Sequence, residues 1–92
     1  MYVIYKYPIP PVTKFYINIP LDAKVLSVQA QIQSDRPQVW VLLNPDLPKQ
    51  ERHFICLATG QETENINNFT KFIGTFQLTN GLVFHLFELL EQ

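Results

Sequence analysis

Prolines and turn residues divide this 92-residue chain into short segments of β-type composition. Seven prolines are present, at positions 8, 10, 11, 20, 37, 45 and 48. Because proline lacks the N–H that a helix interior or a central strand requires, these positions end regular segments. No apolar pattern of helical period extends beyond about two turns. The sequence therefore predicts short strands joined by turns.

Three segments in the first part of the chain have the composition of half-buried strands. Residues 2–7 are mostly β-branched and aromatic and end at a proline. Residues 14–19 alternate apolar and polar side chains before the next proline. The clearest alternation lies in residues 24–32, where one face of the strand is expected to carry Leu26, Val28, Ala30 and Ile32.

The middle of the chain predicts a hairpin, a loop and a further strand. Turn residues at 34–37 lie between two apolar segments, so residues 24–43 are expected to form a β-hairpin. A loop follows at residues 44–50. Turn signals flank residues 51–59, which favours a strand there, although a helix is also compatible. The polar residues 61–68 predict another loop.

The last hairpin can be assigned a register from its turn. A three-residue loop at 79–81, with Gly81 in the left-handed conformation of a bulge, places apolar residues opposite one another. A two-residue loop would instead place polar residues opposite apolar ones. The chosen register pairs Leu78 with Leu82, Phe76 with Phe84 and Gly74 with Leu86 on one face, and Gln77 with Val83, Thr75 with His85 and Ile73 with Phe87 on the other.

Taken together, these segments predict a single all-β domain over residues 1–92. Its architecture is expected to be a small sandwich or a partly open barrel of about six to seven antiparallel strands. The final residues, 86–92, could form one short helical turn.

The charge balance disfavours a polyanion partner. Seven Lys and Arg are balanced by eight Asp and Glu, so the chain has no excess of basic residues. This balance disfavours binding to nucleic acid and to anionic membrane surfaces. No stretch approaches the 18 apolar residues of a membrane span. A single cysteine, Cys56, cannot form an internal disulfide, and residues 1–11 lack the apolar run of a signal peptide. We therefore expect a protein of the cytoplasm.

Candidate catalytic and metal-binding groups are few. His53, His85 and Cys56 lack the spacing of a zinc site, and we expect no metal or other cofactor. His85 beside Thr75 resembles a base next to a nucleophile, but no carboxylate is placed to orient the imidazole. We therefore expect no catalytic residue and no enzyme activity.

The aromatic residues are the best candidates for binding. Two interpretations stay open: they close one end of a barrel, or they form a binding or dimer surface. The aromatic set is Tyr2, Tyr5, Tyr7, Tyr16 and Trp40. The candidate binding residues are Tyr5, Tyr7, Tyr16, Trp40, Arg52 and His85.

Several segments occur together and in order along the chain: "IYKYPI" at 4–9, "AKVLSVQAQ" at 23–31, "VWVLLNPD" at 39–46, "ATG" at 58–60, and "FIGTFQL" with "GLVFHLFE" in 72–88. In these segments the chain resembles a family of small proteins, encoded mainly in phage and prophage genomes and their bacterial hosts, that is labelled as a domain of unknown function. The resemblance supplies no catalytic residues. It implies a phage or prophage setting, in the cytoplasm of a bacterial host.

The leading functional hypothesis is a non-enzymatic interaction module that forms a homo-oligomer or binds a host protein. Edge strands carry unpaired backbone N–H and C=O groups, which association with another chain would satisfy. Residues 2–7 are the expected edge strand. The alternative is a small-ligand binder that sequesters a nucleotide-like defence signal, with tyrosines stacking on the ligand and Arg36, Arg52 or Lys71 contacting its phosphate. A small enzyme that uses His85 has the least support.

Overall fold

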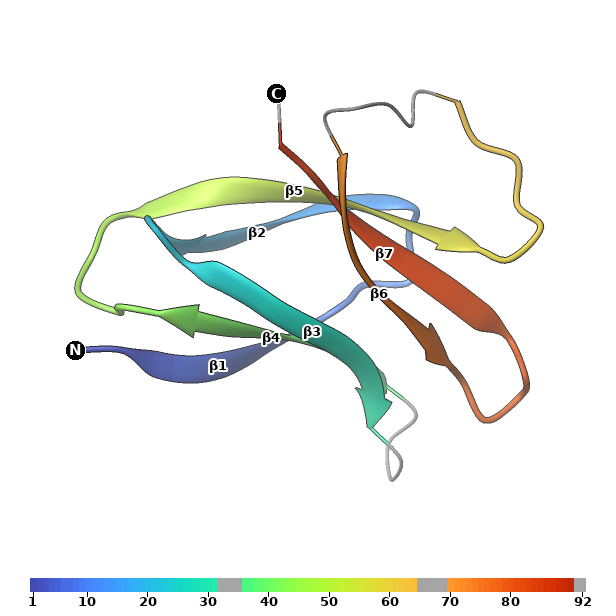
Figure 1. Ribbon diagram of the computed structural model, residues 1–92, viewed down its shortest axis with the longest axis horizontal. Coiled ribbons are helices and arrows are strands. Elements are labelled where there is room, and N and C mark those ends of the chain that lie inside the picture. The colour runs from blue at the N-terminus through green and yellow to red at the C-terminus, as the bar shows by residue number, and fades with distance from the viewer. Residues whose placement is uncertain (32–35, 65–69, 91–92) are drawn as a thin grey trace.

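The computed structural model describes residues 1–31, 36–64 and 70–90, which form seven strands in two antiparallel sheets. The strands are β1 (Val3–Pro8), β2 (Lys14–Pro20), β3 (Lys24–Gln31), β4 (Arg36–Leu43), β5 (Lys49–Ala58), β6 (Thr70–Gln77) and β7 (Val83–Leu89). One sheet has the order β1-β4-β3 and the other has the order β2-β5-β7-β6. Figure 1 shows β1, β4 and β3 in the lower layer and β2 and β5 in the upper one. The predicted all-β fold is confirmed as a sandwich that does not close into a barrel.

Apolar side chains from both sheets fill the space between the layers. Val39, Val41 and Leu43 alternate along β4 and are fully buried, because β4 is the central strand of its sheet. Phe54 on β5 and Leu86 on β7, the two central strands of the opposite sheet, are also fully buried and belong to the same core. The strand periodicity read from the sequence therefore places these residues in one shared core.

The proline-rich connections are the places where the chain changes sheets. Residues 9–13 carry it from β1 to β2, residues 21–23 from β2 to β3, and residues 44–48 from β4 to β5. Each of these crossovers contains a proline or directly follows one. A residue that cannot donate to a ladder thus ends one sheet and frees the chain to cross to the other. The expected loop at 44–50 is shorter than predicted, because β5 begins at Lys49.

The β6–β7 hairpin has the predicted turn. Gly81 has a φ of 92°, its N–H donates to the Leu78 carbonyl at 3.0 Å, and the Leu78 N–H donates to the Leu82 carbonyl at 2.9 Å. Thr75 lies opposite His85, and Phe76 lies opposite Phe84, as predicted. These bonds and pairs confirm the three-residue loop.

Two β-bulges correct the predicted faces. A bulge between Phe72 and Gly74 places Phe72, rather than Ile73, opposite Phe87. A second bulge between Val25 and Ser27 turns Val25 toward the core and leaves Leu26 41% exposed. An inserted residue reverses the alternation on one side of it, which a regular pattern does not reveal.

The remaining segment predictions have mixed outcomes. The strand predicted at residues 51–59 is confirmed as part of β5. The C-terminal helical turn is wrong, because residues 86–89 continue β7 and pair with β5. Arg36 and Pro37, predicted as turn residues, begin β4 instead. Ile32, the first half of the turn predicted at 34–37 and the second half of the 61–68 loop lie outside the described residues.

We predict that Gly81→Val lowers the free energy of unfolding by about 1 to 3 kcal/mol, because a β-branched residue is strained at positive φ. An added Cβ would meet no atom within 4 Å, so backbone strain alone is tested. Gly81→Asn is the matched control, since asparagine tolerates this conformation. Urea denaturation should show a clearly smaller loss for Gly81→Asn; equal stability of the valine variant and the wild type would contradict the assigned turn.

Candidate binding site

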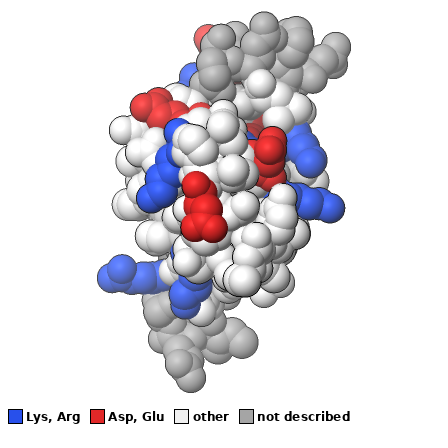
Figure 2. Space-filling view, turned by 90° about the vertical axis from the view of Figure 1, so that its left-hand side faces the viewer, with Lys and Arg blue, Asp and Glu red and all other residues white. Residues whose placement is uncertain are grey.

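Charged side chains of both signs are mixed on the face of the molecule shown in Figure 2. Figure 2 shows acidic and basic side chains interspersed at the end of the sandwich that faces left in Figure 1, with no continuous patch of either sign among the described residues of that face. In the described part of the chain, no three His, Cys, Asp or Glu side chains gather closely enough to hold a metal ion. None of its described segments is a helix able to cross a membrane. Candidate sites therefore come from shape and hydrogen bonding rather than from charge.

Strand β1 lies at the edge of its sheet, as expected. Its ladder with β4 shows which of its backbone N–H and C=O groups have no hydrogen-bond partner within the sheet. The Ile9 N–H donates to the Pro37 carbonyl at 3.0 Å, and the β1–β4 register continues without a shift. Since hydrogen-bonded pairs alternate along an antiparallel ladder, Tyr5 and Tyr7 direct their backbone groups toward β4. Ile4 and Lys6 direct theirs away from the sheet, where none of the seven described strands pairs with them.

The other three edges are better protected. The β3 and β6 edges lie against each other, so that a Cβ added at Gly74 would come within 3.0 Å of Val28 Cγ1, and each strand carries a bulge. On β2 the same ladder argument directs Lys14, Tyr16 and Asn18 outward, so two polar residues flank the single aromatic one. Bulges, outward charged residues and prolines are the usual protection of sheet edges. Strand β1 has no bulge; Lys6 and Pro8 protect its second half, so its unprotected part lies around Ile4.

Apolar side chains line this β1 edge. Tyr2 is 59% exposed, Ile4 57% and Tyr5 48%. The one charged residue of the strand, Lys6, extends back over the outer face of its own sheet and donates from Nζ to Gln31 Oε1 at 3.0 Å. We name Tyr2, Ile4, Tyr5 and Lys6 the β1 edge.

The predicted aromatic residues do not form one cluster. Tyr5 and Tyr7 share the inner face of β1, where burial, with a smaller contribution from Tyr5, raises the pKa of the Tyr7 phenol. Tyr16 lies on the outer face of the other sheet and contacts the His53 ring edge-on, with centroids 5.7 Å apart. Trp40 lies on the outer face of β4, beside Lys6. The interpretation that these rings close one end of a barrel is wrong, because the sheets form an open sandwich.

Arg52 is held inside the sandwich. Its guanidinium forms a two-point ion pair with the carboxylate of Glu88, which is 3% exposed, and its Nη1 donates to the Ala23 carbonyl at 2.8 Å. An external anion would have to displace Glu88 to reach this guanidinium. Arg52 therefore acts as a link between β5, β7 and the crossover before β3.

His85 lies between two threonines on the outer face of its sheet. Its Nε2 is 2.7 Å from Thr59 Oγ1, and its Nδ1 is 2.9 Å from Thr75 Oγ1. Because a hydroxyl can either donate or accept, both nitrogens of a neutral imidazole are satisfied. Glu88, three residues along β7, points to the opposite face, where Arg52 binds it. Within the described part of the chain, His85 thus has two hydroxyl partners and no carboxylate that orients it.

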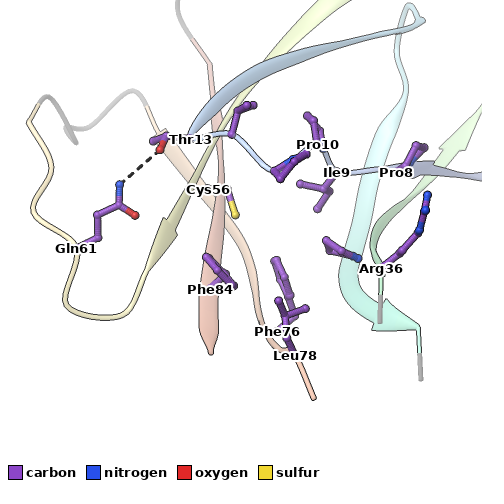
Figure 3. Close-up of a pocket in the computed structure, with 13 residues that line it drawn as sticks. Pro8, Ile9, Pro10, Thr13, Arg36, Cys56, Gln61, Phe76, Leu78 and Phe84 are labelled. Atoms are coloured by element: carbon purple, nitrogen blue, oxygen red, sulfur yellow. Dashed lines mark hydrogen bonds between the residues drawn. The ribbon is translucent and has the colours of Figure 1, made fainter. Parts of the chain in front are cut away.

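A hollow of about 640 Å³ opens where the two sheets separate at the end of β1. The crossover at 9–13 forms one wall, and Phe76, Leu78 and Phe84 from the β6–β7 hairpin form another (Figure 3). Arg36 is its one charged lining residue among those described. The complete lining is Pro8, Ile9, Pro10, Pro11, Val12, Thr13, Arg36, Pro37, Cys56, Gln61, Phe76, Leu78 and Phe84.

Two polar side chains that line this hollow, Gln61 and Thr13, hydrogen-bond to each other. The Gln61 side chain accepts from the Ala58 N–H at 2.9 Å and donates to Thr13 Oγ1 at 3.5 Å. Cys56 also lines the hollow, and burial raises the pKa of its thiol to about 11. The thiol is therefore protonated at neutral pH and behaves as an apolar group there.

Comparison with known proteins decides the family. A model of the family described as a domain of unknown function (DUF7352) matches residues 1–92. The chain belongs to this family. No curated protein and no solved structure matches it significantly. The family description assigns no activity, so function in this DUF7352 member has to be argued from its own residues.

Sequence reasoning missed three parts of these sites. Glu88 was not recognised as the partner of Arg52, because the two are far apart in sequence and only the β5–β7 pairing joins them. Thr59, the second partner of His85, lies beyond the end of β5 and has no distinctive pattern. The hollow was also missed, although the Pro8–Pro10–Pro11 sequence signalled a stiff crossover that must stand away from a ladder.

We predict that His85→Gln changes the free energy of unfolding by less than about 1 kcal/mol, since the glutamine amide can still bind a threonine hydroxyl. His53→Gln is the matched control, because His53 lies on the outer face of the same sheet. Thermal denaturation compares the two variants. In any assay that gives the wild type a phenotype, both should retain function; selective loss in a well-folded His85→Gln variant would make His85 a functional residue.

Proposed function

We propose that this protein is a non-enzymatic interaction module that associates with a second copy of itself through the β1 edge. The observation that carries the proposal is the unshared backbone of Ile4 and Lys6, bordered by exposed apolar side chains. An edge of this kind binds by strand addition, in which backbone hydrogen bonds supply affinity and flanking side chains supply specificity.

A second copy fits this edge in geometry and in charge. Two identical β1 strands can pair antiparallel about a two-fold axis, which is the commonest symmetry of homo-oligomers. Such pairing would join the two β1-β4-β3 sheets into one continuous sheet and satisfy the outward N–H and C=O groups of both strands. The net charge of −1 gives little self-repulsion between copies.

The register of such a pair is restricted by Lys6. An axis at Lys6 would place the two ammonium groups directly opposite each other, which is destabilising. An axis near Ile4 or Tyr5 avoids this and places apolar side chains across the two-fold. Because a single strand pair buries little area, we expect a dissociation constant in the micromolar range.

The surroundings of the candidate catalytic residue support a non-enzymatic role. A general base needs an orienting partner or a free nitrogen that reaches substrate, and both His85 nitrogens already face hydroxyls. The remaining candidate nucleophile, Cys56, is held as a neutral thiol by burial.

The biological setting is part of the same proposal. The sequence segments that resemble phage and prophage proteins support a role in the cytoplasm of a bacterial host, where a host protein is the second candidate for the β1 edge. Charge disfavours a nucleic-acid partner, because Lys and Arg do not exceed Asp and Glu.

We predict that Ile4→Lys weakens self-association at least about tenfold, because each copy then brings an extra charge to the shared edge. Tyr16→Lys is the matched control: Tyr16 is also half exposed and points outward from an edge strand, β2. Sedimentation equilibrium at micromolar concentrations should show a reversible dimer for the wild type and for Tyr16→Lys.

Two results would contradict the proposal. A wild type that sediments as a single 10.7 kDa species at every accessible concentration would exclude self-association. A dimer that survives Ile4→Lys but is lost in Tyr16→Lys would assign the contact to β2 instead.

A further inference from the structure

We infer that the hollow at the end of β1 is a binding site for a small uncharged molecule with an apolar body and a single hydrogen-bond acceptor. This ligand site is distinct from the β1 edge and does not depend on self-association.

The hollow has the size and the surface of a pocket for a small apolar molecule. Its volume of about 640 Å³ lies within the range of small-molecule pockets, about 300 to 1,000 Å³. The phenyl rings of Phe76 and Phe84 stack with centroids 5.6 Å apart and form a continuous aromatic wall. Burial raises the pKa of the nearby Cys56 thiol to about 11, so this side chain also lines the hollow as a neutral group (Figure 3). An apolar ligand would remove these surfaces from water, which favours its binding.

The opposite wall is preformed. Three prolines, Pro8, Pro10 and Pro11, restrict the backbone of the crossover, and the Ile9 N–H is fixed to the Pro37 carbonyl. Ile9 itself belongs to the buried core, so this wall is anchored between the sheets. A pocket with rigid walls loses little conformational entropy when it binds a ligand.

The one charged residue of the described lining, Arg36, is not directed into the hollow. It lies on the exposed outer face of β4, opposite to the inward Val39 and Val41, and it has an interaction of its own. In Figure 3 its side chain extends away from Phe76 and Phe84. A charged ligand would therefore lose hydration in the hollow without gaining an oppositely charged partner. This arrangement selects an uncharged molecule.

The hydrogen-bonding groups of the lining leave room for one acceptor atom. The Gln61 side chain accepts from the Ala58 N–H at 2.9 Å and donates to Thr13 Oγ1 at 3.5 Å. Because a hydroxyl can accept and donate at the same time, the Thr13 hydroxyl keeps a proton that it can donate to a ligand oxygen. A few polar groups of this kind orient the ligand in a mostly apolar pocket.

A charge series on one ring system tests the ligand class. The neutral fluorescent probe N-phenyl-1-naphthylamine should bind the folded protein saturably. Three competitors share a naphthalene ring and differ in charge: neutral 1-naphthalenemethanol, anionic 1-naphthoate and cationic 1-naphthylmethylammonium. We expect the neutral alcohol to displace the probe at a concentration at least about tenfold lower than either ion, because only the ions lose hydration without compensation. Absence of saturable binding, or an ion that competes as well as the alcohol, would overturn the assignment.

A pair of lysine variants tests the location. Val12 lines the hollow and is 52% exposed, so Val12→Lys brings a cation to the site without disturbing the core. Leu21, which is 39% exposed on the crossover before β3, is outside the lining, and Leu21→Lys is the matched control. Val12→Lys should tighten 1-naphthoate at least about threefold and change 1-naphthalenemethanol by less than about twofold. Leu21→Lys should change neither, and equal shifts in the two variants would place the ligand elsewhere and overturn the assignment.

Cys56 reports on the same space, because it is the sole cysteine and lines the hollow. Its alkylation by N-ethylmaleimide, followed by intact-mass measurement at mildly alkaline pH, should slow at least severalfold when 1-naphthalenemethanol is present. An unchanged rate would overturn the assignment to the hollow.

The Ile4→Lys variant separates the two proposals. Its hollow is intact, so 1-naphthalenemethanol should still displace the probe from a protein that sediments as a monomer. Loss of probe binding in this variant would show that the ligand site belongs to the dimer contact and would overturn an independent hollow.

Discussion

The buried ion pair between Arg52 and Glu88 is the interaction on which the arrangement of the two sheets depends. Two charges between packed sheets are tolerated only when they bind each other and when their remaining donors find partners. Here the guanidinium spans from the carboxylate on β7 to the Ala23 carbonyl on the crossover before β3, so one side chain ties both layers together. Removal of one partner from a buried pair typically costs about 3 to 5 kcal/mol, a large fraction of the stability of so small a domain.

The consequences of this tie reach both candidate sites. Fixing the start of β3 sets where β4 lies, and among the described strands β4 is the one that pairs with β1. The β3 and β6 edges meet on one side of the sandwich, which leaves β1 and β2 as the edges of the other side. Of these two, β1 has apolar flanks, and its end leads directly into the proline-rich wall of the hollow. A single segment, residues 2–13, thus contributes both to the β1 edge and to the lining of the hollow.

The sequence predicted the regular features of this fold and missed those that depend on irregular or distant contacts. Alternation and prolines located the strands, and the requirement that apolar residues face each other selected the register that places Thr75 opposite His85. The bulges near Leu26 and Ile73 were not predictable, because one inserted residue leaves the local composition unchanged. The alternative hypothesis made Arg52 one of three candidate contacts for a ligand phosphate, whereas the structure pairs it with Glu88, which only the β5–β7 ladder brings close. Periodicity describes each strand, but it does not report which strands become neighbours.

The central claim is that the outward backbone groups of β1 are the protein's contact with a second copy. Residue-resolved amide hydrogen exchange, measured by NMR at several protein concentrations, tests it most directly. The account predicts that the Tyr5 and Tyr7 amides, which bond to β4, are protected at every concentration, whereas the Ile4 and Lys6 amides exchange rapidly when dilute and become protected as concentration rises. Exchange at Ile4 and Lys6 that stays equally fast at all concentrations, or protection that appears on β2 instead, would contradict it.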